Sequence, residues 1–321
     1  MVDHIVNAVE DPSAVRTQPG EPRASLNIRE FLDEPEPERN YVIDGVLERG
    51  ERLILTGGEG KGKSSLIRQL GVQAAAGIHP FTLMTMEPVR VLLIDLENPR
   101  RHLKTQLRSL YVKAGADLEP DAFHVESAPA GIDLLLAVWR AWLLDRVVAN
   151  APDLLLIGPL YKLAFGDPCS EEVARVVAFG LDDVRAKHDL AIVLEAHSPY
   201  SSSGGKRPQR PYGASLWSRW PEFGIHLGDD GALSHWRGPR DERDWPAMLK
   251  RGGEWPWTVE SNQRQVTFAR IVDLTRERGK RLSLRELEQT LNVPKSTIDR
   301  AVAANQRVYD ELVAEMSEVG L

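Results

Sequence analysis

The stretch that decides the fold reads Gly57-Gly-Glu-Gly-Lys-Gly-Lys-Ser64 and fits the pattern G-x-x-x-x-G-K-[ST]. An apolar run at residues 52–56 precedes it, and a helical pattern of apolar residues at 64–76 follows it. Glycines allow successive backbone N–H groups to turn inward around an anion, and the positive end of the next helix points to the same place. This order of strand, loop and helix predicts a phosphate-binding P-loop, because a chance glycine-rich turn lacks that context.

The loop also predicts how the phosphates are held. Lys63 is expected to reach the β- and γ-phosphates of ATP, and the Ser64 hydroxyl is expected to bind Mg²⁺. ATP and Mg²⁺ are therefore the expected ligands. The expected ATP-binding residues are Gly57, Gly58, Glu59, Gly60, Lys61, Gly62, Lys63, Ser64 and Ser65.

Outside the loop, apolar runs alternate with helical patterns. Strands are expected at residues 52–56, 89–96, 123–125, 153–157 and 190–195, and helices at 64–76, 100–114, 132–149 and 171–187. A hairpin at 222–236 and edge strands at 258–259 and 266–268 would follow. The alternation predicts an α/β fold with a mostly parallel central sheet and helices on both faces.

The composition limits the class of protein. The 321 residues carry a net charge of −7 and one cysteine, Cys169, which excludes a disulfide framework and a cysteine-rich zinc site. The most apolar long stretch, residues 132–157, contains five charged residues, and the first residues lack the pattern of a signal peptide. We therefore expect a cytoplasmic protein with no membrane partner.

The charge is divided unevenly along the chain. Residues 1–48 contain eleven acids and four bases, whereas residues 264–307 contain ten bases and five acids. We expect a flexible acidic arm at 1–40, an ATPase domain at 41–263 and a small all-α domain at 264–321. The basic end keeps nucleic acid open as a partner despite the acidic average.

A pair of acids closes the second apolar strand, which ends Leu93-Ile-Asp-Leu-Glu-Asn98. We place this strand beside the P-loop strand, so that Glu97 lies where the γ-phosphate and its attacking water meet. Glu97 can then orient the water and take its proton. Asp95, two residues earlier, projects to the same side of a regular strand. The alternative is a strand end with solvated acids.

Four motifs, in this chain order, resemble the RecA-like P-loop ATPase superfamily, and within it the RepA-like and DnaB-like hexameric replicative helicases. They are the P-loop and residues 93–98, 153–163 and 190–197. The resemblance covers residues 41–259. It implies a homo-hexamer that binds ATP between subunits and unwinds DNA during replication of a phage, plasmid or similar element. It also implies that Glu97 is the catalytic glutamate and that His197 senses the γ-phosphate; a hydrogen-bonded structural histidine is the alternative.

One position departs from that family. Its Walker B strand ends in an aspartate that holds Mg²⁺ through water, whereas here the strand at 153–157 is followed by Gly158. Glycine supplies no carboxylate, so we expect Glu195 or Asp95 to join Ser64 at the metal. An inactive ATPase is the alternative.

Basic side chains end the predicted hairpin before a Gly-Pro turn. In DnaB-like proteins such a strand end sends a cation to the γ-phosphate of the neighbouring subunit, where it stabilises charge. The resemblance makes Arg237 the first candidate for this finger and Arg240 the second. An ion pair with the acids at 241–244 of the same chain is the alternative.

A long Gly/Ser/Pro-rich and basic loop, residues 198–213, follows His197. A loop of this length in a compact domain is usually functional or disordered. Lys206, Arg207 and Arg210 suit phosphates, and Tyr200 and Tyr212 can stack on bases. In RecA-like hexamers the corresponding loop touches single-stranded DNA in the central channel, which makes single-stranded DNA the expected partner here. A solvated loop is the alternative.

Residues 284–302 have the spacing of a helix-turn-helix motif or of its winged-helix variant. Asn292 suits the left-handed geometry of the tight turn between the two helices. Ser296, Thr297 and Arg300 stand near the start of the second helix and could face duplex DNA. A helical module for protein contacts is the alternative.

Together these features predict a RecA-like ATPase that acts as an oligomeric DNA helicase or translocase. A recombination or annealing ATPase of the RecA/RadA-like kind is one alternative. A nucleotide-switched DNA-binding regulator that hydrolyses ATP slowly is the other, and the glycine at position 158 permits it.

Overall fold

The computed structural model describes residues 27–33, 39–115, 118–200, 207–238, 243–259, 263–291, 293–304, 306, 309–310 and 312–314. The chain divides into two units, Met1–Arg39 and Asn40–Leu321. Within the described part of the first unit, helix α1 (Ile28–Asp33) has no buried residue. Its N-terminus is capped by the Asn27 side chain, whose Oδ1 accepts hydrogen bonds from the backbone N–H groups of Arg29 and Glu30, both at 3.0 Å. Most of the predicted acidic arm lies outside the described residues.

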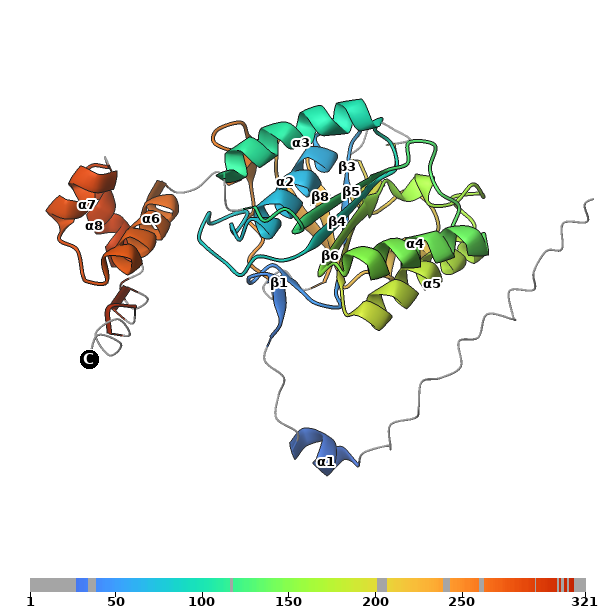
Figure 1. Ribbon diagram of the computed structural model, residues 1–321, viewed down its shortest axis with the longest axis horizontal. Helices are drawn as coiled ribbons and strands as arrows, with labels where there is room; N and C mark the ends of the chain where they lie inside the picture. Colours follow the sequence, from blue (N-terminus) through green and yellow to red (C-terminus); the bar gives the residue numbers. More distant parts are fainter. Residues whose placement is uncertain are drawn as a thin grey trace, which may run out of the picture. The chain divides into compact units, whose positions relative to one another are not determined.

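Seven strands form the main sheet of the second unit (Figure 1). Their order across the sheet is β5 (Phe123–Ser127), β4 (Val91–Asp95), β6 (Leu154–Gly158), β7 (Ala191–His197), β3 (Arg52–Gly57), β8 (Phe223–Leu227) and β9 (Leu233–Arg237). Every neighbouring pair is parallel except β8 and β9. The mostly parallel sheet, with the P-loop strand β3 in its interior and helices on both faces, confirms the α/β fold that the sequence predicts.

The expected neighbour of the P-loop strand is wrong. We placed the strand of Asp95 and Glu97 beside β3, but β6 and β7 lie between β3 and β4. Parallel strands are joined by long crossovers that can skip positions, so the order across the sheet is not set by order along the chain. Glu97 still reaches the same end of the sheet, because all four of these strands run in one direction.

Helices cover both faces of the sheet. In Figure 1, α2 (Lys63–Ala75) and α3 (Arg100–Ala114) lie on one face, and α4 (Ala137–Asn150) and α5 (Glu171–His188) lie on the other. Successive strand residues point to opposite faces, so Leu55 packs with the α2 side and Ile54 with the α5 side. Burial on both faces explains the continuous apolar runs of the central strands.

Two small antiparallel hairpins stand outside the main sheet. They are β1 (Tyr41–Ile43) with β2 (Leu47–Glu48), and β10 (Leu249–Arg251) with β11 (Trp257–Val259). The strand expected at 258–259 is therefore part of β11. The strand expected at 266–268 is wrong, because these residues belong to helix α6 (Gln263–Arg278), where Phe268, Ile271 and Val272 have the spacing of one buried helical face.

The described C-terminal helices share an apolar cluster of their own. After α6 come α7 (Leu284–Leu291) and α8 (Lys295–Ala304), and the cluster includes the buried residues Ile271, Leu287 and Ile298. A capping box begins α7: Ser283 N–H donates to the Glu286 carboxylate at 2.8 Å, and Glu286 N–H donates to Ser283 Oγ at 3.3 Å. Asn292 lies outside the described residues, so the helix-turn-helix motif stays a prediction. In the described chain, no helix has the length and apolar character needed to span a membrane.

Candidate active site

The P-loop joins the end of β3 to the start of α2. Gly60 and Gly62 have φ angles of +66° and +94°, which favour glycine. A Cβ on Gly62 would also lie 2.9 Å from the Trp257 ring, so a larger residue there would displace a buried side chain. Backbone geometry and close packing therefore both require glycine at position 62, the second glycine that defines the motif.

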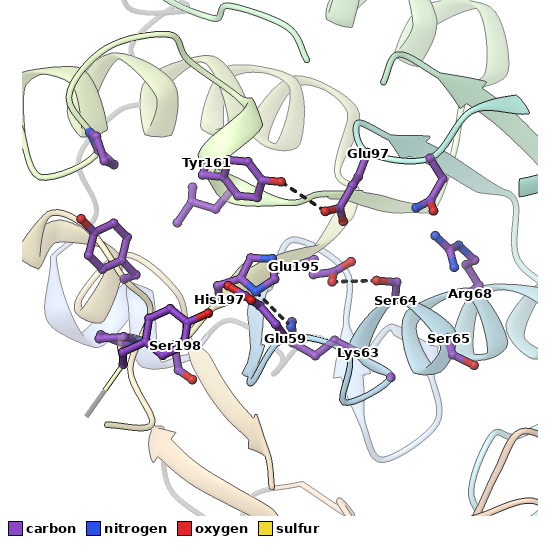
Figure 2. A pocket seen from close by; sticks show the side chains of 18 of the residues that line it. Glu59, Lys63, Ser64, Ser65, Arg68, Glu97, Tyr161, Glu195, His197 and Ser198 are labelled. Carbon is purple, nitrogen blue, oxygen red and sulfur yellow. Dashed lines mark hydrogen bonds between the residues drawn. The ribbon is translucent and has the colours of Figure 1, made fainter. Parts of the chain in front are cut away.

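A cavity of about 1160 Å³ opens beside this loop. Its walls come from the P-loop and from the ends of β4, β6 and β7, where Glu97, Tyr161, Glu195 and His197 stand (Figure 2). These are carboxyl ends of parallel strands, the usual ligand position in an open α/β sheet. The structure thus brings together the P-loop, Glu97, Glu195 and His197, as the sequence predicts.

Lys63 is buried and folded onto its own loop. Its Nζ donates a hydrogen bond to Gly58 O at 2.9 Å and lies 3.4 Å from His197 Nδ1. Burial lowers the pKa of Lys63, and the carboxylates of Glu195 and Glu97 oppose that effect. Burial and the positive charge of Lys63 also lower the pKa of His197. A neutral His197 ring can accept a hydrogen bond from the lysine.

Glu195 lies directly against the serine of the P-loop. The Ser64 hydroxyl donates a hydrogen bond of 2.8 Å to Glu195 Oε1, and Glu195 is only 8% exposed. Burial raises the pKa of Glu195, while the charge of Lys63 and the bond from Ser64 lower it. A serine oxygen beside a carboxylate is an oxygen donor set of the kind that Mg²⁺ takes in phosphate sites. Of the two acids expected at the metal, Glu195 has the fitting position.

Gly158 and Glu195 are sterically linked. A Cβ on Gly158 would lie 2.7 Å from the Glu195 Cβ, and Gly158 has a φ angle of +150°. The Glu195 side chain therefore fills the space into which a side chain at position 158 would project. The carboxylate absent from the end of β6 has a counterpart on the neighbouring strand β7.

Asp95, the other acid expected at the metal, is engaged elsewhere. It pairs with Arg68 of α2 at 2.6 Å, and both side chains are buried. Asp95 Oδ1 also accepts hydrogen bonds from the backbone N–H groups of Glu97 at 3.0 Å and Asn98 at 2.7 Å. These contacts fix the turn that carries Glu97 and engage both oxygens of the Asp95 carboxylate.

The expected DNA-binding loop lies partly outside the described residues, including Lys206. Arg207 donates to the carbonyl oxygens of Ser198 and Pro199, both at 2.9 Å, and its guanidinium lies 4.6 Å from the centroid of the Tyr200 ring. A Cβ on Gly58 would lie 2.9 Å from Arg207 Nη1. Arg207 is thus held beside the P-loop, whereas Arg210 is exposed.

Of the remaining expected site residues, Arg237 and Ser296 are described and are not among the residues that line the cavity. Arg237, at the end of β9, donates to the carbonyl oxygens of Pro221 at 3.1 Å and Arg219 at 3.3 Å. Arg240 and the acids at 241–242 lie outside the described residues. Ser296 is exposed in the first turn of α8, and nothing is described of the Thr297 and Arg300 side chains. The roles of these residues in a finger and in DNA contact stay predictions.

Three residues at the site escape sequence reasoning. Arg68 holds Asp95, Tyr161 donates to Glu97 at 3.2 Å, and Trp257 Nε1 donates to Gly62 O at 3.1 Å. The last contact joins residues 195 positions apart. Tyr161 alone leaves a signal in the sequence, as an aromatic residue just after the strand that lacks its terminal acid.

Comparisons with known proteins agree with this geometry at the level of the family. The KaiC-like protein PH0186 from Pyrococcus horikoshii OT3 is a similar solved structure, with 15% sequence identity and a TM-score of 0.47. The likeness covers 67% of this chain and 91% of that one. A search of the curated proteins finds no match. The AAA_25 family, described as an AAA domain, matches residues 17–203, which is more than half of the chain. The chain therefore belongs to the AAA_25 family of P-loop ATPases.

Proposed function

We propose that this P-loop ATPase is an oligomeric motor, a hexamer, that couples ATP hydrolysis to movement along single-stranded DNA and to unwinding during replication. The observation that carries the proposal is the contact between Lys63 and His197, whose Nζ and Nδ1 atoms lie 3.4 Å apart. The expected DNA loop begins directly after His197 and returns to it, because Tyr212 N–H donates to His197 O at 2.8 Å. A change at the phosphates can therefore reach both ends of the loop.

The hydrolysis step rests on this chain's own side chains. Lys63 would exchange its bond to Gly58 O for one to the phosphates and stabilise their charge. Glu97 would orient the attacking water and accept its proton. Ser64 and Glu195 would hold Mg²⁺, which when bound neutralises charge on the β- and γ-phosphates. The buried Glu195 keeps its carboxylate beside Ser64 with no side chain at 158 to displace it.

The proposed DNA contacts come from Lys206, Arg207 and Arg210 of the loop. Arg207 already has three partners beside the P-loop, which suits a residue that transmits the nucleotide state to its neighbours. The C-terminal part, with ten bases and five acids at 264–307, would add contacts to duplex DNA through Ser296, Thr297 and Arg300. Arg237 would act on the ATP of a neighbouring subunit.

A second candidate is a nucleotide-switched DNA-binding regulator that hydrolyses ATP slowly. The observation in its favour is Gly158, because the strand β6 ends without the acid that the resembling helicases carry there. Such a protein would bind duplex DNA in a nucleotide-dependent manner and would not separate strands.

A forked-duplex unwinding assay with ATP and Mg²⁺ tests the proposal, together with native mass spectrometry. We expect oligomers and strand separation by the wild-type chain, and neither ATP turnover nor unwinding by Lys63→Ala. The double variant Lys206→Ala/Arg210→Ala should bind single strands more weakly and with a smaller salt dependence. Arg175→Ala, an exposed cation on α5, is the matched control and should leave both unchanged. ATP turnover without unwinding, combined with site-specific duplex binding, would support the regulator instead.

A further inference from the structure

The aromatic residue three positions after Gly158 has no role in the function proposed so far. Tyr161 lies in the short 3₁₀ turn η3 (Leu160–Lys162), directly after β6. It lines the cavity beside the P-loop and is 46% exposed. An exposed aromatic side chain at the edge of a site is available for contacts there that packing alone does not require.

Tyr161 binds Glu97, the glutamate proposed to orient the attacking water. Its hydroxyl donates a hydrogen bond of 3.2 Å to Glu97 Oε1, drawn as a dashed line in Figure 2. Among the residues that the structure describes, this is the only hydrogen bond made by the Glu97 carboxylate. The Glu97 backbone is fixed by Asp95, but its exposed side chain has several rotatable bonds. Among the described residues, the tyrosine is therefore the group that can restrict the position of this carboxylate.

The tyrosine is itself held in place by the second group expected at the γ-phosphate. Its ring packs against the His197 ring, with centroids 5.7 Å apart and planes tilted by 51°. The hydroxyl and the ring thus make separate contacts, the hydroxyl with Glu97 after β4 and the ring with His197 at the end of β7. Substitutions can remove the first contact and leave the second.

The hydroxyl remains a donor throughout the neutral range. Burial, and next the negative charge of Glu97, raise the pKa of Tyr161 to about 12. A protonated phenol beside a carboxylate makes a charge-assisted hydrogen bond, which is stronger than one between neutral groups.

We propose that Tyr161 is a positioning residue for ATP hydrolysis, whose hydroxyl holds the Glu97 carboxylate toward the attacking water while its ring packs on His197. The role rests on the proposed hydrolysis by Glu97. It assigns a task to the segment that follows the acid-free end of β6, a segment to which the family resemblance gives no such role.

Steady-state hydrolysis by Tyr161→Phe tests the role, with binding of a fluorescent ATP analogue measured in parallel. The phenylalanine keeps the ring against His197 and loses only the hydroxyl. We expect kcat to fall by about tenfold, because a misplaced base loses part of its catalytic effect, while KM and nucleotide affinity change by less than about twofold. Tyr111→Phe is the matched control, since this exposed tyrosine of α3 is not among the residues that line the cavity.

A double-mutant cycle separates positioning from structure. Glu97→Asp shortens the side chain and withdraws the carboxylate from Tyr161, so adding Tyr161→Phe to it should change kcat by less than about twofold. An unchanged or raised kcat in Tyr161→Phe alone would overturn the role, and so would a full tenfold fall in the Glu97→Asp background. Absence of turnover by the wild-type chain would overturn the proposed hydrolysis together with this role. Turnover by the wild-type chain with an unchanged kcat in Tyr161→Phe would overturn the role alone.

Discussion

The Arg68 guanidinium donates a hydrogen bond of 2.6 Å to the Asp95 carboxylate, and both side chains are buried beneath the nucleotide cavity. Arg68 belongs to α2, the helix that begins at the P-loop, and Asp95 ends β4. Because Asp95 also accepts from the backbone of Glu97 and Asn98, the pair joins the P-loop helix to the turn that carries Glu97, the proposed catalytic glutamate. The two halves of the proposed chemistry are thus fixed to each other by one buried ion pair.

Breaking this pair should cost stability. Asp95→Asn leaves the Arg68 charge buried without its counter-charge, and we expect the unfolding free energy to fall by about 3–5 kcal/mol. Urea denaturation followed by tryptophan fluorescence measures the change. Asp183→Asn removes the partner of Lys187 from a more exposed pair on α5 and should cost less than about 1 kcal/mol. Equal losses in the two variants would show that the buried pair contributes no more to the free energy of unfolding than the exposed pair.

Glu195 should contribute to the binding of Mg²⁺. Glu195→Gln keeps the size of the side chain beside Ser64 but removes its charge, so we expect the affinity for ATP in the presence of Mg²⁺ to fall by about tenfold or more. Affinity without Mg²⁺ should stay within about twofold. Titration of a fluorescent ATP analogue with and without Mg²⁺ measures both. Glu172→Gln, an exposed acid on α5, is the control. An unchanged Mg²⁺ dependence in Glu195→Gln would show that Glu195 is not the metal's carboxylate.

Gly158 should tolerate no side chain. Gly158→Ala places a Cβ 2.7 Å from that of Glu195 at a φ angle of +150°, and we expect it to lower the unfolding free energy by about 2–4 kcal/mol. Gly279→Ala tests a positive φ angle without a steric contact, because Gly279 has a φ angle of +60° and open space around it, and it should cost about 1–2 kcal/mol. Thermal denaturation compares the two. A Gly158→Ala protein as stable as Gly279→Ala would mean that Glu195 moves aside freely.

Local patterns in the sequence predict the parts of the site that are built from neighbouring residues. The P-loop, Glu97 just after β4, and Glu195 and His197 of β7 are each identified by the strand or helix beside them, and the structure gathers them at one cavity. Strand order is different, because crossovers of any length can skip a position, so β6 and β7 separate β4 from β3.

The partners of these residues need the tertiary structure. Asp95 reads as a metal ligand from its place at the strand end, but a residue 27 positions away, Arg68, takes its charge. Tyr161 and Glu97 are 64 positions apart, and no spacing rule connects an aromatic residue to a distant carboxylate. Residues 266–268 are too short a stretch for a prediction. Over three residues, the alternation of a strand cannot be told from the buried face of a helix, and these residues belong to α6.

His79 should make stability fall as the pH decreases. Its Nδ1 accepts hydrogen bonds from the backbone N–H groups of Phe81 and Thr82, both at 3.1 Å, and its Nε2 lies 2.9 Å from Asp44 O. Burial lowers the pKa of His79 below its ordinary value, because it disfavours the charged ring. A proton on Nδ1 would also break both bonds from the backbone N–H groups. The unfolded chain therefore binds this proton first as the pH falls through about 6.5, and stability is lost from there downward to the lower folded value.

The variant His79→Asn isolates this contribution. An asparagine can offer Oδ1 to the same N–H groups but does not titrate, so we expect a lower stability at pH 7.5 and a smaller further loss between pH 7.5 and 5.5 than in the wild-type chain. Urea midpoints across that range measure the difference, and carboxylates that titrate in the same range act on both proteins and cancel. His102→Asn, an exposed histidine on α3, is the control. A wild-type chain and a His79→Asn variant with the same dependence on pH would show that His79 binds its proton equally in the folded and unfolded states.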